Sequence, residues 1–191
     1  MKILIALLIN LTMFAGIAFA GLANHNVSPI FRIFPDQPLM DQAVNIRLSG
    51  LPPQLPVTIR ATMLLAQYTW HSHASFVADR HGNIDLGKLA PMGGSYSGVD
   101  PMGLFRSMTP DAAQSSTRKN GEANSLDPVV TNFVAEIEGR PVASVNLTRL
   151  WTKPGIRITD IRENGLVGKL FEPQTKGRHP CVLVLSGSEG G

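Results

Sequence analysis

The stretch PVTIRATM, residues 56–63, carries an apolar side chain at every second position after its proline. Successive side chains of a β-strand point to opposite faces, so this alternation gives one apolar and one polar face. The stretch therefore predicts a strand with one side on a core and the other toward solvent. Its apolar positions are Val57, Ile59, Ala61 and Met63.

Three further stretches show the same period of two, which favours a fold built mostly of strands. Short strands separated by turn residues predict an antiparallel β-sandwich, and we expect it to span residues 28–172. The further positions expected to face inward are Val44, Ile46 and Leu48, then Phe133, Ala135 and Ile137, then Ala143, Val145 and Leu147.

Turn residues separate these stretches. Asn164-Gly165, between the expected strands 156–161 and 166–171, is the strongest hairpin signal, because both residues accept the positive φ of a type I′ turn. A polar stretch from Thr109 to Asp127 predicts a long surface loop. Other predicted turns are Pro52-Pro53, His81-Gly82-Asn83 and Glu138-Gly139-Arg140-Pro141.

Residues 1–20 have the pattern of a secretory signal peptide. Lys2 precedes a mostly apolar run, and Ala18-Phe19-Ala20 offers the small residues that a signal peptidase recognises. We expect cleavage between Ala20 and Gly21 and export to the periplasm or the outside of the cell. The alternative is an uncleaved membrane anchor, since the run is roughly long enough to span a bilayer. After cleavage, no membrane association is expected.

Charge and cysteine content narrow the function classes. The sequence has 17 lysines and arginines against 14 acidic residues, a formal net charge of +3. No basic run with interleaved aromatic residues is present, so a nucleic-acid partner is not expected. A single cysteine, Cys181, cannot form a disulfide within the chain, and stability must come from the core. No cofactor and no metal are predicted.

The pattern changes near the carboxyl end. Residues 181–185, CVLVL, form a continuous apolar run, which is typical of a strand buried on both faces in a parallel sheet. Cys181 is accordingly expected to be a buried core thiol. The glycine-rich residues 186–191 follow at once. We interpret residues 173–191 as the incomplete start of a second domain.

Four stretches resemble the family of acyl-CoA thioester hydrolases and bile-acid-CoA:amino-acid N-acyltransferases. The most specific is PMGGSYSGVDPMGLF, residues 91–105. The others are residues 51–61, 166–173 and 179–191. The resemblance implies an immunoglobulin-like β-sandwich over residues 21–172, followed by the truncated start of an α/β-hydrolase domain. Family members hydrolyse acyl-CoA thioesters or transfer the acyl group to glycine or taurine, so an acyl-CoA-type substrate is implied.

The catalytic machinery of the family is not expected within these residues. Members carry a Ser or Cys nucleophile, an Asp and a His in the hydrolase domain, and this missing domain is the implied partner. By resemblance, the backbone of Gly187, Ser188 and Glu189 would form part of the oxyanion hole. Two other readings remain: a nucleophile elbow at Ser188, because SGSEG is close to G-x-S-x-G, or a plain turn.

Other chemistry-bearing residues each allow two readings. His71 and His73 share a face of a strand and are either a metal pair or solvent-facing polar positions. Gly93-Gly94 is either a ligand loop or a tight turn that admits only glycine. By resemblance, Ser95 and Tyr96 would lie at the domain interface if the sandwich packs over the hydrolase cleft. Trp70 and Trp151 are expected to be core aromatics rather than binding platforms. Asn26 and Asn146 fit the glycosylation pattern, which is frequent by chance.

Two functions from different classes follow. In the first, the chain is the amino-terminal part of an acyl-CoA thioesterase or acyl-CoA:amino-acid N-acyltransferase and is inactive alone. In the second, it is an exported β-sandwich that binds a partner without catalysis, because such a sandwich hosts many functions.

Overall fold

The computed structural model describes residues 28–65, 68–111 and 126–185. Within these residues almost all regular structure is strand, and the pairing of the named strands is antiparallel throughout. The predicted mostly-β, antiparallel architecture is confirmed. One short helix, α1 (Gly103–Arg106), was not anticipated from the sequence.

The larger sheet is built around a long hairpin, β3 (Pro56–Leu65) and β4 (Tyr68–Val77). β8 (Val129–Ile137) pairs with the other edge of β3, and β9 (Arg140–Arg149) pairs with β8. The free edge of β4 is covered at two places by the short strands β6 (Gly93–Gly94) and β7 (Thr109–Pro110). The strand order is therefore β6-β4-β3-β8-β9, with β7 also on β4.

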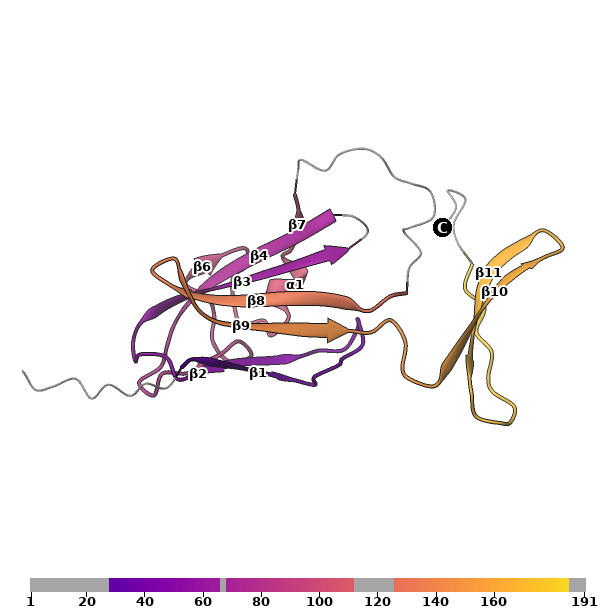
Figure 1. The fold of residues 1–191 in the computed structure, drawn as a ribbon, viewed down its shortest axis with the longest axis horizontal. Coiled ribbons are helices and arrows are strands. Elements are labelled where there is room, and N and C mark those ends of the chain that lie inside the picture. Colours follow the sequence, from indigo (N-terminus) through magenta and orange to yellow (C-terminus); the bar gives the residue numbers. More distant parts are fainter. Residues whose placement is uncertain (1–27, 66–67, 112–125, 186–191) are drawn as a thin grey trace, which may run out of the picture.

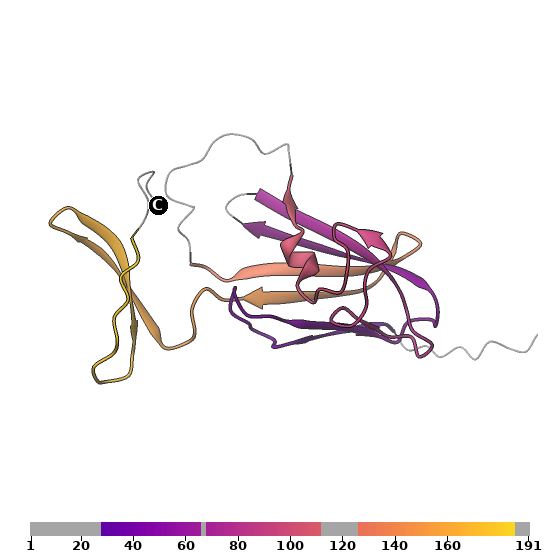
Figure 2. The ribbon, with the colours of Figure 1, turned by 180° about the vertical axis from the view of Figure 1, so that it is seen from behind.

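The smaller sheet consists of β1 (Ile30–Phe34), β2 (Asn45–Ser49) and β5 (Ile84–Asp85), in the order β1-β2-β5. Figures 1 and 2 show it as a second layer facing the larger sheet. The two layers also meet at one margin, where Leu39 forms a parallel bridge with Leu150. Two packed antiparallel layers are what the alternating stretches predict.

One core lies between the two sheets. Ile46 and Leu48 enter it from the smaller sheet, and Ile59 and Phe133 enter it from the larger one, each fully shielded from solvent. The inward positions predicted from the period of two in β2, β3, β8 and β9 are all buried or partly buried. The alternation is thus explained by a single apolar layer that both sheets share.

The predicted turns at Glu138-Gly139 and Asn164-Gly165 form, whereas Arg140 and Pro141, also assigned to the first turn, begin β9. Glu138 and Gly139, at φ 51° and 75°, join β8 to β9, and Asn164 and Gly165, at φ 52° and 80°, join β10 (Ile156–Glu163) to β11 (Leu166–Pro173). These paired positive φ values are those of type I′ turns, which suit the twist of hairpin strands. In the turn at His81-Gly82-Asn83, the Asp79 carboxylate accepts backbone hydrogen bonds from His81 and Asn83, both at 2.8 Å.

The hairpin β10–β11 forms a sheet of its own. The sequence pattern had included this segment in the sandwich, whose two sheets instead end at Arg149. Figure 1 shows the hairpin set apart from both larger sheets. Alternation along a strand predicts its two faces but not which sheet it joins, because strand partners are chosen by contacts distant in sequence.

Replacing Ile59 by alanine should lower the free energy of unfolding by about 2–5 kcal/mol, because it opens a cavity in the shared core. Ile59 is 0% exposed on the central strand β3. Thr62→Ala, at an exposed position of the same strand, should change it by no more than about 0.5 kcal/mol. Urea unfolding of the two variants tests this, and equal losses would show that β3 does not face a core as described.

Candidate functional site

The segment 91–105, which carries the most specific resemblance, runs along the free edge of β4. Met92 N donates to Ser75 O at 2.8 Å, and Ser95 N donates to His73 O at 2.8 Å. Between them Gly93 and Gly94 pair with β4 as strand β6. The expectation of a tight turn at Gly93-Gly94 is wrong, because the two glycines pair with a sheet edge, whereas the ligand loop stays a prediction.

Glycine is required at only one of the two positions. A Cβ on Gly94 would lie 2.4 Å from His73 O and 2.7 Å from Ala74 Cα, and the φ of Gly94 is +127°. At Gly93 an added Cβ would meet nothing within 4 Å. The backbone of β6 therefore approaches β4 more closely at Gly94 than any side chain allows.

The rest of the segment turns inward and caps the core. Asp100 Oδ1 accepts a hydrogen bond from Met102 N at 2.8 Å, and the Asp100 carboxylate pairs with Arg106 at 2.7 Å. Ser72 Oγ donates to Leu104 O at 2.6 Å from within the sheet. These contacts fix α1 against the larger sheet, so the segment is a structural cover of the sandwich.

Tyr96 lies against α1. The helix approaches so closely that a Cβ on Gly103 would lie 2.2 Å from the Tyr96 ring. The Tyr96 hydroxyl is buried and has no hydrogen-bond partner among the described residues. Burial raises the pKa of Tyr96 to about 12, and the negative charge of Asp100 acts in the same direction. Its ring packs against the core, whereas Ser95 stays at the sheet surface with its hydroxyl accepting from His73 N.

Arg149 is a buried cation that the sequence analysis missed. Its guanidinium lies 4.5 Å from the centre of the Phe105 ring and donates through Nη2 to Met40 O. Its Nε is buried, and within the described part of the chain it has no hydrogen-bond partner. Burial lowers the pKa of Arg149, and the charge of Asp41 acts in the opposite direction. The available signal was the period of two, which places residue 149 on the inward face after residue 147.

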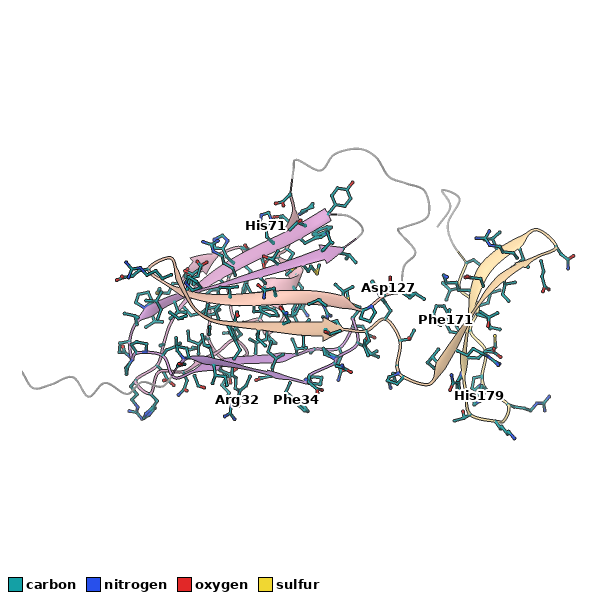
Figure 3. All side chains as sticks on the ribbon, viewed as in Figure 1. Arg32, Phe34, His71, Asp127, Phe171 and His179 are labelled. Atoms are coloured by element: carbon teal, nitrogen blue, oxygen red, sulfur yellow. The ribbon has the colours of Figure 1, made fainter. Side chains whose placement is uncertain are left out.

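The two histidines of β4 point outward from the larger sheet. His71 and His73 are both exposed, which confirms their interpretation as solvent-facing positions, and Figure 3 marks His71 at the upper edge of the sheet. His71 Nδ1 lies 3.0 Å from Asp111 Oδ1. Among the described residues no three His, Cys, Asp or Glu side chains form a group that could hold a metal ion.

These histidines do not form a hydrolytic triad. Ser95 Oγ lies 3.5 Å from His73 Nδ1, whereas the carboxylate of Asp111 contacts the other histidine, His71. A Ser-His-Asp triad requires one imidazole that contacts both the nucleophile and the carboxylate. The arrangement therefore lacks the geometry for nucleophilic acyl transfer.

The carboxyl-terminal part of the described chain is open to solvent. Residues 181–185 form no strand, and Val182 and Val184 are each 84% exposed. Cys181 is exposed, so its expectation as a buried core thiol is wrong. A parallel strand forms only with a neighbour that takes up its backbone hydrogen bonds, and no described segment pairs with these residues. They line one hollow together with β11, Arg157 and Ile161 of β10, and residues 174–177, 179 and 180.

The remaining predicted positions divide into three groups. Trp70 is partly buried against the core, as expected, but Trp151 is 39% exposed and is not a core residue. Asn146 lies exposed on β9 and accepts a hydrogen bond from Asn132 at 2.8 Å. The signal-peptide residues, with Ala20 and Gly21, and Asn26 lie outside the described residues, as do Gly187, Ser188 and Glu189 and most of the predicted loop 109–127. Within the described part, no helix is both long enough and apolar enough to cross a membrane.

Comparison of the sequence with known proteins and with family models indicates one family. A family model described as the acyl-CoA thioester hydrolase/BAAT N-terminal region matches residues 41–163. Mouse acyl-coenzyme A thioesterase 6 is 34% identical over 179 residues, which cover 88% of this chain and 40% of that protein.

Acyl transferases match equally well. Mouse acyl-coenzyme A amino acid N-acyltransferase 1 is 35% identical over 82% of this chain and 39% of its own length. Human bile acid-CoA:amino acid N-acyltransferase is 34% identical over 82% of this chain and 40% of its own. The chain thus spans about 40% of the length of these relatives.

Gly94→Ala should lower the free energy of unfolding by about 1–3 kcal/mol, because alanine is strained at this φ and its Cβ would overlap β4. Gly93→Ala is the matched control, and we expect a change within about 0.5 kcal/mol. Chemical denaturation of both variants measures the difference. A Gly94→Ala protein as stable as its control would disprove the close approach of β6 to β4.

Tyr96→Phe should remove an alkaline loss of stability. The unfolded tyrosine loses its proton near pH ~10, whereas the folded one keeps it to about 12. The contribution of this group is therefore complete below pH ~10 and is lost as the pH rises toward ~12. The unfolding free energy of the wild type, minus that of Tyr96→Phe, should fall over this window. Tyr68→Phe, at an exposed tyrosine, is the control, and parallel pH profiles for wild type and Tyr96→Phe would contradict the assignment.

Proposed function

We propose that this chain, which belongs to the acyl-CoA thioester hydrolase/BAAT family, is the amino-terminal β-sandwich part of an enzyme that acts on acyl-CoA thioesters. The observation that carries the proposal is the family match over residues 41–163, which extends from the segment before β2 to the end of β10. The named relatives are acyl-CoA thioesterases and acyl-CoA amino acid N-acyltransferases. The acyl acceptor in our proposal is therefore either water, giving free fatty acid and CoA, or an amino acid.

Catalysis in this proposal relies on an α/β-hydrolase domain outside the 191 residues. Acyl transfer from a thioester needs an activated nucleophile, a base within hydrogen-bond reach and donors for the oxyanion. The nearest approach to such a set among the described residues involves Ser95 and Asp111, which contact different histidines. The sandwich therefore serves as a partner to the catalytic domain, and its immunoglobulin-like architecture is part of the proposal.

The segment after the sandwich supports a connection to such a domain. An isolated two-stranded hairpin is marginally stable in water. Both faces of β10–β11 nevertheless carry exposed apolar side chains, such as Phe171 on one and Leu170 on the other. The run 182–185 adds four more exposed apolar residues. We infer that residues 173–191 begin the hydrolase sheet and that Gly187, Ser188 and Glu189 contribute to its oxyanion hole.

Export is a further part of the proposal. The pattern of residues 1–20 predicts a signal peptide and a mature chain that begins at Gly21. In this account the protein acts in the periplasm or outside the cell, where the thioester substrate has to be available.

A second candidate is an exported β-sandwich that binds a partner without catalysis. The contacts of the two histidines favour this candidate. Asp111 contacts His71 and Ser95 contacts His73, so these side chains form no triad on the described sheet. Translation of the DNA downstream of codon 191 in all three frames separates the two candidates. A frame that encodes G-x-[SC]-x-G, then Asp, then His favours the enzyme, whereas unrelated sequence after a stop favours the binding module.

The purified 191-residue chain should release no thiol from an acyl-CoA above a buffer blank. Loss of a nucleophile or base typically lowers the rate by about 10⁴–10⁶-fold, which leaves nothing measurable here. The same chain joined to the downstream hydrolase frame should release thiol, and replacing the new nucleophile by alanine should abolish that release. Turnover by the 191-residue chain that survives repurification and disappears in Ser188→Ala would overturn the proposal and identify Ser188 as the nucleophile.

A further inference from the structure

The outer face of the smaller sheet combines cations with an exposed aromatic ring. Ile30, Arg32 and Phe34 are the exposed residues of β1, and their side chains point away from the core because they alternate with Phe31 and Ile33. Figure 3 shows Arg32 and Phe34 projecting from the same side of this layer into solvent. Arg47 on β2 lies directly opposite Arg32 in the register. We call these four residues the β1–β2 outer face.

The charges on this face are unbalanced. Like charges directly opposite each other on paired strands destabilise a sheet. Arg47 Nε is compensated by Asp85 Oδ2 at 2.9 Å. Arg32 takes part in no ion pair or side-chain hydrogen bond among the described residues. Two guanidinium groups thus face one carboxylate, and an anion bound between them would remove their repulsion.

The aromatic residue beside this pair is unusually open to water. Phe34 is 77% exposed and Ile30 is 53% exposed, although both lie on a regular strand. Cross-strand neighbours have Cβ atoms about 4.5–5.5 Å apart, and residues two apart on one strand are about 6.4–6.8 Å apart. A single ligand that carries a phosphate and a planar ring therefore reaches Arg32, Arg47 and Phe34 together.

We propose that the β1–β2 outer face binds a phosphorylated adenine nucleotide, with Arg32 and Arg47 on phosphate oxygens and the base stacked on Phe34. The guanidinium fork matches phosphate geometry with two parallel hydrogen bonds. Base–aromatic stacking is sequence-tolerant and strong enough to add to affinity. This inference rests on the proposed function, because acyl-CoA carries a phosphorylated adenosine at the end of the molecule opposite the thioester.

Larger anionic partners fit this face less well. Membrane recognition by charge uses clusters of about 4–8 basic residues, and this face offers only the Arg32–Arg47 pair. A nucleic acid requires many phosphate contacts along a basic stripe, whereas the whole chain has a net charge of +3. The small number of cations and the adjacent ring favour one nucleotide.

The test is calorimetric titration of the full 191-residue chain with adenosine 3′,5′-bisphosphate. Arg32→Gln and Phe34→Ser should each weaken binding about tenfold or more, since one removes a charged hydrogen bond and the other the stacking surface. Arg140→Gln is the matched control for charge, because Arg140 is exposed at the start of β9. Leu64→Ser, at an exposed position of β3, is the control for lost apolar surface. Neither control should change the affinity.

Several results would overturn the site. One is the absence of heat with the bisphosphate at millimolar concentration. Another is a loss in Arg140→Gln equal to that in Arg32→Gln, which would indicate a general charge effect. Equal affinity for inorganic phosphate and the bisphosphate, unchanged in Phe34→Ser, would show that the face binds phosphate without recognising the adenosine. Binding of phosphatidylserine vesicles without binding of the bisphosphate would indicate a membrane surface. The titration measures binding and not turnover, so each of these outcomes would overturn the nucleotide site without bearing on the acyl-CoA proposal, which the thiol-release experiment tests.

Discussion

Strand β3 is hydrogen-bonded to a neighbouring strand along both edges and is buried on one face, and the rest of the sandwich depends on this central position. Its backbone groups are taken up by β4 on one side and β8 on the other. Its inward face meets the smaller sheet across a core from which water is excluded. Because β4 pairs with β3 along one edge only, its other edge lies at the border of the sheet. Segment 91–110 covers that edge at two places through β6 and β7. Free strand edges promote pairing with other chains, so such a cover protects the fold.

This arrangement gives a physical reason for the residues that make segment 91–105 recognisable. Gly94 permits the close approach to β4, Gly103 permits the contact with Tyr96, and Asp100 fixes the turn into α1. None of these roles requires a substrate. A specific sequence motif can therefore arise from the covering of a sheet edge rather than from substrate binding. In this chain the motif contacts the larger sheet, and the proposed nucleotide site lies on the smaller one.

The sequence predicted what depends on local pattern and failed where distant contacts decide. The period of two identified the inward residues of β2, β3, β8 and β9, and the type I′ turn at Asn164-Gly165 followed from its two residues. Arg149 was missed because a charged residue at an inward position is unexpected until its partners, Phe105 and Met40, are known. Cys181 was placed in a core because apolar runs are usually buried, but burial requires a neighbouring segment. The predicted oxyanion residues 187–189 lie outside the described residues, and their role stays a prediction.

The margin where β9 ends also determines how force would enter the fold. Among the described residues, Leu150 is the last one before the hairpin that is hydrogen-bonded to the sandwich. Across a parallel bridge, Met40 N donates to Leu150 O and Leu150 N donates to Pro38 O, each at 2.9 Å. Just before it, the Arg149 side chain bonds to Met40 O. Tension applied through the hairpin would load the two backbone bonds of Leu150 before it reached the pairing of Arg149 with Val129 on β8. The end of β9 would thus act as a mechanical clamp between the hairpin and the core.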